Sequence, residues 1–234
     1  MQVTEGSGHN AFVEPSRCYE TLLSPVELPC LEWIARRLPV WILPDHLTLV
    51  GLLACVAIGL CYSLTSVNGR SLLAIPVLLA INWFGDSQNG TLARARGCVQ
   101  PRYGFYIDHI ADTIGAVFVL GGLSLSGVMS RGIAAWLLIS FLLLSVEVYL
   151  ATHTLGRFQM SHWRLGPTEI RLVLALFSTL AYWFPVITVA KHSYQLFDLL
   201  GGMGIACGIG MFVVALVRNM TTLRQLDPLN YLSR

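Results

Sequence analysis

Apolar residues form six long stretches along the chain, separated by short segments that carry most of the charged side chains. The stretches cover Leu47–Leu64, Leu72–Asn89, Phe105–Val128, Gly132–Thr152, Pro167–Val189 and Leu196–Met220. Each is close to the ~20 residues that an α-helix needs to cross the ~30 Å hydrocarbon layer of a bilayer. The pattern therefore predicts an all-α integral membrane protein with six transmembrane helices.

The chain before the first apolar stretch has two parts with different patterns of apolar and polar residues. Residues 1–24 are polar and mixed, without periodicity, and are predicted to be a cytosolic tail. In residues 25–42 apolar side chains recur at helical spacing between charged ones, at Leu28, Leu31, Ile34 and Leu38. This pattern predicts a short amphipathic helix lying at the membrane interface, and a helix packed on the cytosolic side of the bundle would share it. Residues 43–220 form the membrane domain, and residues 221–234 form a second cytosolic tail.

The 15 cationic side chains are distributed unevenly over the predicted connections. With six spans both termini share one side, and that side receives Arg17, Arg36, Arg37, Arg94, Arg96, Arg102, Arg157, Arg164, Arg171, Arg218, Arg224 and Arg234. The opposite side receives Arg70, Arg131 and Lys191. Because cytoplasmic loops are enriched in Lys and Arg, both termini and the 90–104 connection are predicted to lie in the cytoplasm.

Composition supports a membrane protein and excludes several other classes. Hydrophobic residues make up 55% of the chain, charged residues only 12%, and the mean hydropathy is +0.64. A net charge of +2 without a basic cluster on a soluble face argues against nucleic acid as a partner. The six cysteines include no CxxC pair and no Cys/His spacing typical of zinc, so neither a disulfide scaffold nor structural zinc is expected.

A cluster of acidic residues lies where the second and third stretches meet. Asp86, Asn89, Gly90 and Ala93 share one helical face, and Gly104, Asp108 and Asp112 share another. Ionised carboxylates at the edge of a bilayer are costly unless something compensates their charge. Oxygen ligands without His or Cys companions favour Mg²⁺ or Mn²⁺ over zinc. A structural polar cluster neutralised by nearby arginines is the alternative.

These residues resemble the signature of the CDP-alcohol phosphotransferases. That signature reads Asp-x-x-Asp-Gly-x-x-Ala-Arg, a short spacer, then Gly-x-x-x-Asp-x-x-x-Asp. Its positions fall on Asp86, Asn89, Gly90, Ala93, Arg94, Gly104, Asp108 and Asp112. Segment 41–51 likewise looks like the Pro-Asn-x-x-Thr motif at the start of the family's first span, with Asp45 in place of asparagine. The clearest departure is Asn89, which stands where the family has its second aspartate.

The resemblance implies a mechanism and a set of site residues. Two divalent cations, Mg²⁺ or Mn²⁺, would be held by Asp86, Asn89, Asp108 and Asp112, and Asp112 would act as general base. Nucleotide contacts would fall on Gly90, Ala93, Arg94 and Gly104. The reaction would move a phosphoalcohol or phosphatidyl group from a CDP-alcohol donor to a lipid or polar alcohol acceptor, releasing CMP. Members of the family commonly form homodimers, so a second copy is an expected partner.

Four further residues are candidate contacts for the acceptor or for phosphate. Glu147 lies within the fourth stretch, where an intramembrane carboxylate lines a cavity or pairs with an arginine. Arg157, Arg164 and Arg171 place cations near the proposed active face, although helix capping alone accounts for the Gly-Pro-Thr-Glu sequence before Arg171.

Two readings compete with a working transferase. Asn89 favours a catalytically impaired relative that binds nucleotide or lipid, or acts as a scaffold. A cation transporter would need polar groups at midplane and inverted repeats, and neither is visible in the sequence. The sequence hints about the donor conflict, so both CDP-diacylglycerol and CDP-choline or CDP-ethanolamine remain candidates.

Overall fold

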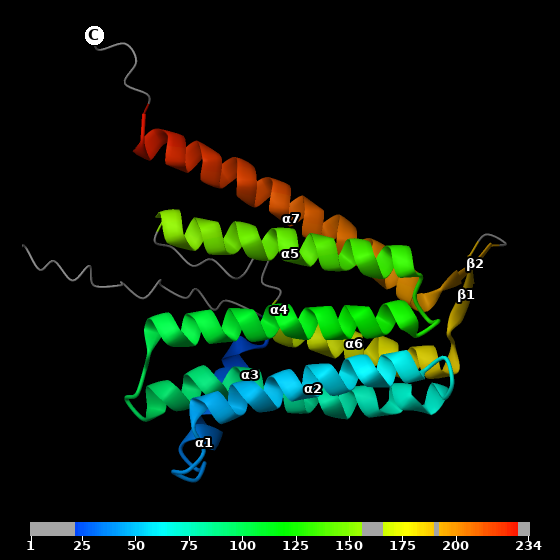
Figure 1. Cartoon of the computed structure of the whole chain (residues 1–234), viewed down its shortest axis with the longest axis horizontal. Helices are drawn as coiled ribbons and strands as arrows, with labels where there is room; N and C mark the ends of the chain where they lie inside the picture. Colours follow the sequence, from blue (N-terminus) through cyan, green and yellow to red (C-terminus); the bar gives the residue numbers. More distant parts are fainter. Residues whose placement is uncertain (1–21, 156–165, 190–191, 229–234) are drawn as a thin grey trace, which may run out of the picture.

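The computed structural model describes residues 22–155, 166–189 and 192–228 (Figure 1). Along the chain its elements are α1 (Ser24–Ala35), α2 (Pro44–Leu64), a 3₁₀ helix η1 (Gly69–Ala74), α3 (Ile75–Ala95), α4 (Pro101–Leu125), α5 (Arg131–Leu155), α6 (Pro167–Trp183), β1 (Val186–Val189), β2 (His192–Gln195) and α7 (Leu196–Leu226). Most of the predicted tail 1–24 lies outside the described residues. Helix α7 extends into the predicted tail 221–234 as far as Leu226, and residues 229–234 lie outside the described residues.

The helical class predicted from the sequence is confirmed. Among the described residues, α2, α4, α5 and α7 are long and apolar enough to cross a membrane. The other two predicted spans also form helices, but α3 is polar in its second half and α6 has only 17 residues. The fold is thus that of an integral membrane bundle with four candidate spans in the described chain, and six transmembrane helices remain a prediction.

The predicted span Pro167–Val189 is wrong at its C-terminal end. Helix α6 ends at Trp183, and Phe184 takes φ −135° and ψ 67° outside the helical region. The following residue is Pro185, whose ring disfavours helical backbone at the residue before it. The chain then forms an antiparallel hairpin in which Ile187 pairs with Tyr194.

Helix α1 is shorter than the predicted amphipathic segment 25–42, because it ends at Ala35. Its apolar face buries Leu31 and Ala35 in contact with α3, whereas Trp33 on another face is 57% exposed. The guanidinium of Arg37 lies 3.9 Å from the Trp33 ring. The helix therefore packs against the bundle, and its placement at a membrane interface stays a prediction.

Glycines allow α2 to pack closely against both α3 and α4. A Cβ at Gly122 of α4 would overlap the backbone carbonyl of Gly59 in α2, and one at Gly59 would overlap the carbonyl of Phe118. Backbones can approach this closely only where side chains are absent, as is common between membrane helices. This crossing fixes α4 relative to α2 and thereby positions the acidic residues described below.

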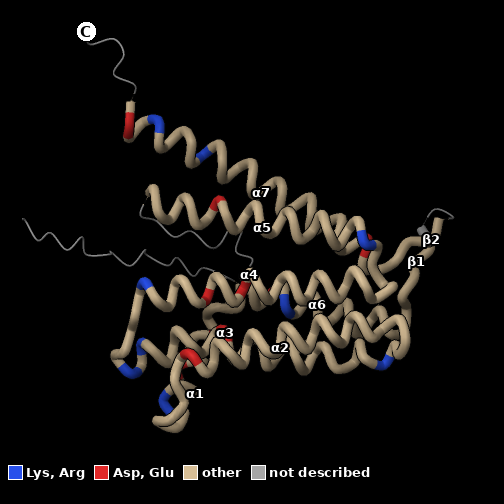
Figure 2. The backbone as a smooth tube through the Cα atoms, in the orientation of Figure 1, with Lys and Arg blue, Asp and Glu red and all other residues tan. Residues whose placement is uncertain are grey.

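Apolar core and charged groups lie toward opposite ends of the bundle. The main buried apolar cluster surrounds Tyr62 and Phe197, near the starts of α3 and α7. Tyr62 is fully buried, and its hydroxyl lies 2.8 Å from that of Ser178. Most charged residues of the described chain lie toward the other end, where α2 and α4 begin and α3, α5 and α7 end (Figure 2).

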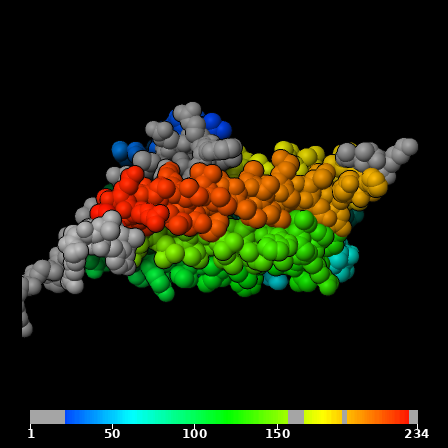
Figure 3. Space-filling view, turned by 90° about the horizontal axis from the view of Figure 1, so that it is seen from above, coloured from blue at the N-terminus to red at the C-terminus, as the bar shows by residue number. Residues whose placement is uncertain are grey.

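Helix α7 lies along α5 on one face of the molecule (Figure 3). The two helices meet through glycines of α7. A Cβ at Gly204 would lie 3.0 Å from Leu137 Cδ1, and one at Gly208 would lie 3.3 Å from Ser140 Oγ. Gly204 and Gly208 thus allow α7 to pack against α5.

Candidate active site

The second half of α3 carries the first part of the acidic motif. Asp86 is half-buried and Asn89 is 7% exposed, one turn further along the helix. Helix α2 can lie directly against this turn because Gly85 has no side chain. A Cβ there would overlap the backbone of Leu47 and Gly51. The absent side chain therefore brings the start of α2 into the site.

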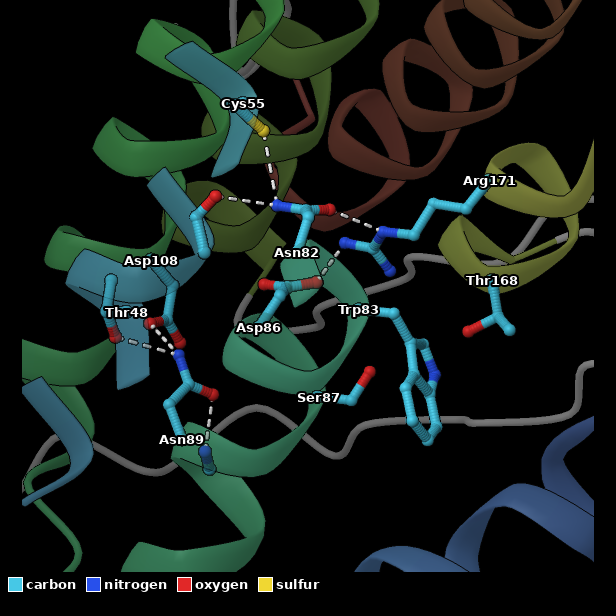
Figure 4. Close-up of polar contacts among 12 residues, drawn as sticks. Thr48, Cys55, Asn82, Trp83, Asp86, Ser87, Asn89, Asp108, Thr168 and Arg171 are labelled. Carbon is cyan, nitrogen blue, oxygen red and sulfur yellow. Dashed lines mark hydrogen bonds and ion pairs between the residues drawn. The ribbon is translucent and has the colours of Figure 1, made fainter. Parts of the chain in front are cut away.

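Asn89 joins three helices through its amide (Figure 4). Its Nδ2 donates hydrogen bonds to Asp108 Oδ1 on α4 at 2.7 Å and to Thr48 Oγ1 on α2 at 3.0 Å. Its Oδ1 accepts from the backbone N–H of Gly90. In this arrangement the amide N–H group of Asn89 faces the Asp108 carboxylate, and the amide oxygen faces the backbone of Gly90.

Asp86 pairs with an arginine that comes from far along the chain. Arg171 of α6 donates from Nη2 to Asp86 Oδ2 at 2.5 Å, and its Nε donates to Asn82 Oδ1 at 2.7 Å (Figure 4). Asn82 in turn donates from Nδ2 to the Gly51 carbonyl at 3.0 Å. Because Asn82 is tied to backbone, the guanidinium is held at two points beside the carboxylate.

Asp112 lies one turn beyond Asp108 on α4. It is close enough to Asp86, Arg171 and Asp108 for their charges to act on it. All four predicted cation-binding positions therefore lie in one region of the structure, with Arg171 beside Asp86. Their roles as ligands and base stay predictions.

The positions predicted to contact nucleotide lie at the rim of this cluster. Gly90 and Ala93 are half-buried on α3, and exposed Arg94 donates from Nη2 to Thr91 Oγ1 at 3.1 Å. A Cβ at Gly104 would meet no protein atom within 4 Å. Packing alone therefore does not require glycine at position 104, and space beside it is open to a ligand.

Two of the four candidate acceptor or phosphate contacts lie in the described part of the chain, and of these two Arg171 lies at the acidic cluster. Glu147 is buried in α5, where Asn219 of α7 donates to its Oε1 at 2.6 Å. Arg157 and Arg164 lie outside the described residues. A role of Glu147 toward the acceptor stays a prediction, and the structure shows it bonded between α5 and α7.

Sequence reasoning missed Asn82, which orients Arg171. The signal was present, because Asn82 precedes Asp86 by four residues and so shares its helical face. It also missed the packing of His109, the residue after Asp108. The His109 ring stacks on Phe105 with centroids 4.1 Å apart and meets Tyr149 of α5 edge-on at 4.9 Å.

Glu27 of α1 is a third missed residue, and it connects three helices. Its Oε1 accepts hydrogen bonds from Trp83 Nε1 at 2.6 Å, from Thr168 Oγ1 at 2.9 Å and from Ser87 Oγ at 3.3 Å. Trp83 and Ser87 flank Asp86 on α3, and Thr168 lies one turn before Arg171 on α6. One carboxylate oxygen therefore sets the spacing of the two helices that carry the Asp86–Arg171 pair.

Replacing Glu27 with alanine is expected to lower the free energy of unfolding by about 2 kcal/mol, because three partly buried donors lose their acceptor. Thermal denaturation of the purified protein in detergent measures the effect. Glu32→Ala is the matched control, since Glu32 is an exposed carboxylate on the same helix. Equal denaturation temperatures for the two variants would contradict the assigned role of Glu27.

The donor chemistry of the cluster fits a hard divalent cation. Three carboxylates and one amide from α3 and α4 supply oxygen ligands, the kind that Mg²⁺ and Mn²⁺ prefer. Among the described residues, no three His, Cys, Asp or Glu side chains are already gathered tightly enough to hold a metal ion. Arg171 and the Asn89 amide instead occupy oxygens of Asp86 and Asp108. A bound cation would therefore have to compete with these two protein donors.

Comparison with protein families agrees with this site. The family model described as CDP-alcohol phosphatidyltransferase matches residues 41–215. Because that match covers most of the chain, the protein belongs to the CDP-alcohol phosphatidyltransferase family. It is thus an enzyme of phospholipid biosynthesis, a membrane transferase that uses a CDP-alcohol. No curated protein matches the chain.

A solved structure supports the same fold. The phosphatidylinositol phosphate synthase PgsA1 of Mycobacterium tuberculosis, crystallised with CDP-DAG bound, aligns with a TM-score of 0.56. The alignment has 21% sequence identity and covers 84% of this chain and 94% of the synthase. At that identity the likeness concerns the fold and leaves the substrate of this chain open.

Proposed function

We propose that the acidic cluster between α3 and α4 is the active site and that it transfers a phosphoalcohol or phosphatidyl group from a CDP-alcohol to an acceptor hydroxyl, releasing CMP. The observation that carries this proposal is the convergence of Asp86, Asp108 and Asp112 from two helices, with Arg171 among them. Charged groups arranged in this way suit phosphoryl transfer, in which catalysis consists mainly of positioning and of stabilising negative charge.

Each residue has a distinct part in this proposal. The Asp112 carboxylate takes the proton from the acceptor hydroxyl as that oxygen attacks phosphorus. Gly90, Ala93 and Gly104 leave room for the nucleotide. Arg94 and Arg171 carry the positive charges that contact phosphate oxygens.

The same proposal assigns the cation ligands to Asp86, Asn89, Asp108 and Asp112. A bound Mg²⁺ or Mn²⁺ would neutralise negative charge on the donor diphosphate.

We also propose a topology for the protein in the membrane. It has six transmembrane helices, both termini lie in the cytoplasm, and the active site faces the cytoplasmic side, where α1 lies at the interface. Support comes from the excess of arginines on the predicted cytoplasmic connections. It also comes from the concentration of charge at one end of the described bundle. A homodimer remains part of the proposal.

A second candidate function is a catalytically impaired relative that binds nucleotide or lipid. Two contacts favour it: the Asn89 amide donates to Asp108, and Arg171 neutralises Asp86. In both contacts a protein N–H group binds a carboxylate oxygen that a divalent cation would otherwise use as a ligand. Neither contact removes Asp112, so the transferase remains the leading proposal.

Release of CMP from purified protein in lipid, with Mg²⁺ or Mn²⁺, tests the choice between the two. CDP-diacylglycerol, CDP-choline and CDP-ethanolamine are each offered with pooled acceptors, and Asn89→Asp is assayed in parallel. We expect CMP from the wild-type protein with one donor and at least equal release from Asn89→Asp, because an added carboxylate binds a divalent cation more strongly than an amide. CMP release by Asn89→Asp alone would establish that the wild-type protein is a catalytically impaired relative. No CMP release by either protein would refute the transferase.

A further inference from the structure

We infer that Arg171 serves as a built-in cation of the site, so that this chain takes one divalent ion where the signature it carries implies two. The inference deepens the proposed function and rests on it. It concerns the charge balance of the cluster and the way in which Arg171 is held.

Arg171 is fixed in place as part of the site. Its side chain is only 15% exposed, and that of Asp86 is 29% exposed. The Nε–H bond to Asn82 and the Nη2–H bond to Asp86 hold the planar guanidinium at two points. Asn82 is itself anchored on the Gly51 carbonyl. An arginine side chain carries its positive charge under all ordinary conditions in proteins.

The charge count of the cluster leaves room for one dication. When ionised, Asp86, Asp108 and Asp112 carry three negative charges, and Arg171 offsets one of them. Asn89 contributes none, although the family signature has an aspartate at this position. A single dication then neutralises what remains. A second would add excess positive charge in a partly desolvated site, where repulsion is screened less than in water.

The positions of the protein donors agree with this count. Asp86 Oδ2 is engaged by Arg171 and Asp108 Oδ1 by Asn89, so two of the oxygens that would hold a pair of cations already have N–H partners. A cation bound to the same oxygen of Asp86 would meet the guanidinium charge at close range. Asn89 and Arg171 thus act together, one by removing a negative charge and the other by supplying a positive one.

Binding of Mn²⁺ to the purified protein tests the inference without relying on turnover. Electron paramagnetic resonance counts the ions bound per chain and detects the spin coupling of two ions ~4 Å apart. We expect one ion per wild-type chain and no coupled pair in the absence of nucleotide. The double variant Asn89→Asp/Arg171→Gln is expected to bind two ions per chain and to show the coupled signal.

Single variants separate the effect of charge from that of folding. Arg171→Gln is expected to bind the first Mn²⁺ at least about tenfold more tightly, because a nearby positive charge is removed. Arg171→Lys keeps the charge and is expected to stay within about threefold of the wild-type affinity. Arg70→Gln is the control for a cation at the far end of the bundle and should change nothing.

Three results would overturn the inference: a coupled pair of ions in the wild-type protein, no saturable Mn²⁺ binding, or an unchanged affinity in Arg171→Gln. These outcomes are distinct from failure of the proposed function. One bound ion without CMP release would leave the charge balance standing and remove the transferase. CMP release with two bound ions would support the transferase and refute the inferred charge balance.

Discussion

Replacing Asp112 with asparagine is expected to lower the rate of CMP release about 10²–10⁴-fold, the usual range for loss of a general base. Asparagine has nearly the same shape but cannot accept the proton of the acceptor hydroxyl. The carboxylate lies where the charges of Asp86, Arg171 and Asp108 converge, and no other residue was predicted to act as the base. Single-turnover measurement of CMP release with saturating donor isolates this step from substrate binding.

The matched control is Asp227→Asn, which removes an exposed carboxylate just after α7 ends. It should retain wild-type turnover. Thermal denaturation of both variants verifies that each is folded. Full turnover by a folded Asp112→Asn protein would refute the assignment of Asp112 as the base.

Gly122→Ala is expected to cause the largest loss of stability, about 3 kcal/mol, because over-packing against backbone cannot be relieved by moving a side chain. The added methyl group would overlap the Gly59 carbonyl at the crossing of α2 and α4. Separating these helices would also displace Asp108 and Asp112 from α3. We therefore expect both a lower denaturation temperature and a loss of CMP release.

The neighbouring glycine provides an unusually close control. A Cβ at Gly121 would meet no atom within 4 Å, although it lies one residue away on the same helix. Gly121→Ala is expected to change stability by no more than about 1 kcal/mol, the size of the helix-propensity difference between the two residues. If both alanine variants denatured at the same temperature, the close contact of α2 and α4 would be refuted.

Several features of the fold could be predicted because they depend on residues near one another in the sequence. The long apolar runs predicted helices, and every predicted span does contain one in the structure. Spacings of three and four residues placed Asp86 with Asn89 and Asp108 with Asp112, since such neighbours share a helical face. The error at the end of α6 was also local. Pro185 signals a helix end, but the apolar run continues past it.

Contacts between distant segments could not be predicted in the same way. Arg171 and Asp86 are 85 residues apart, and Glu27 and Thr168 are 141 apart. Each of several arginines near the predicted cytoplasmic side could have met the acidic cluster. Glu147 was expected near the acceptor or an arginine, and the structure instead joins it to Asn219.

The sequence by itself determined that this protein is a helical membrane transferase with an acidic motif at a helix pair, because hydrophobic period and motif spacing act within one or two helical turns. Only the tertiary structure decided which charge faces which. Close crossings such as Gly59–Gly122 and Gly85–Gly51 set the distances between helices, and those distances select Arg171 as the partner of Asp86 and Asn89 as the donor to Asp108. Packing across the whole bundle fixes such pairings, and no local pattern encodes them.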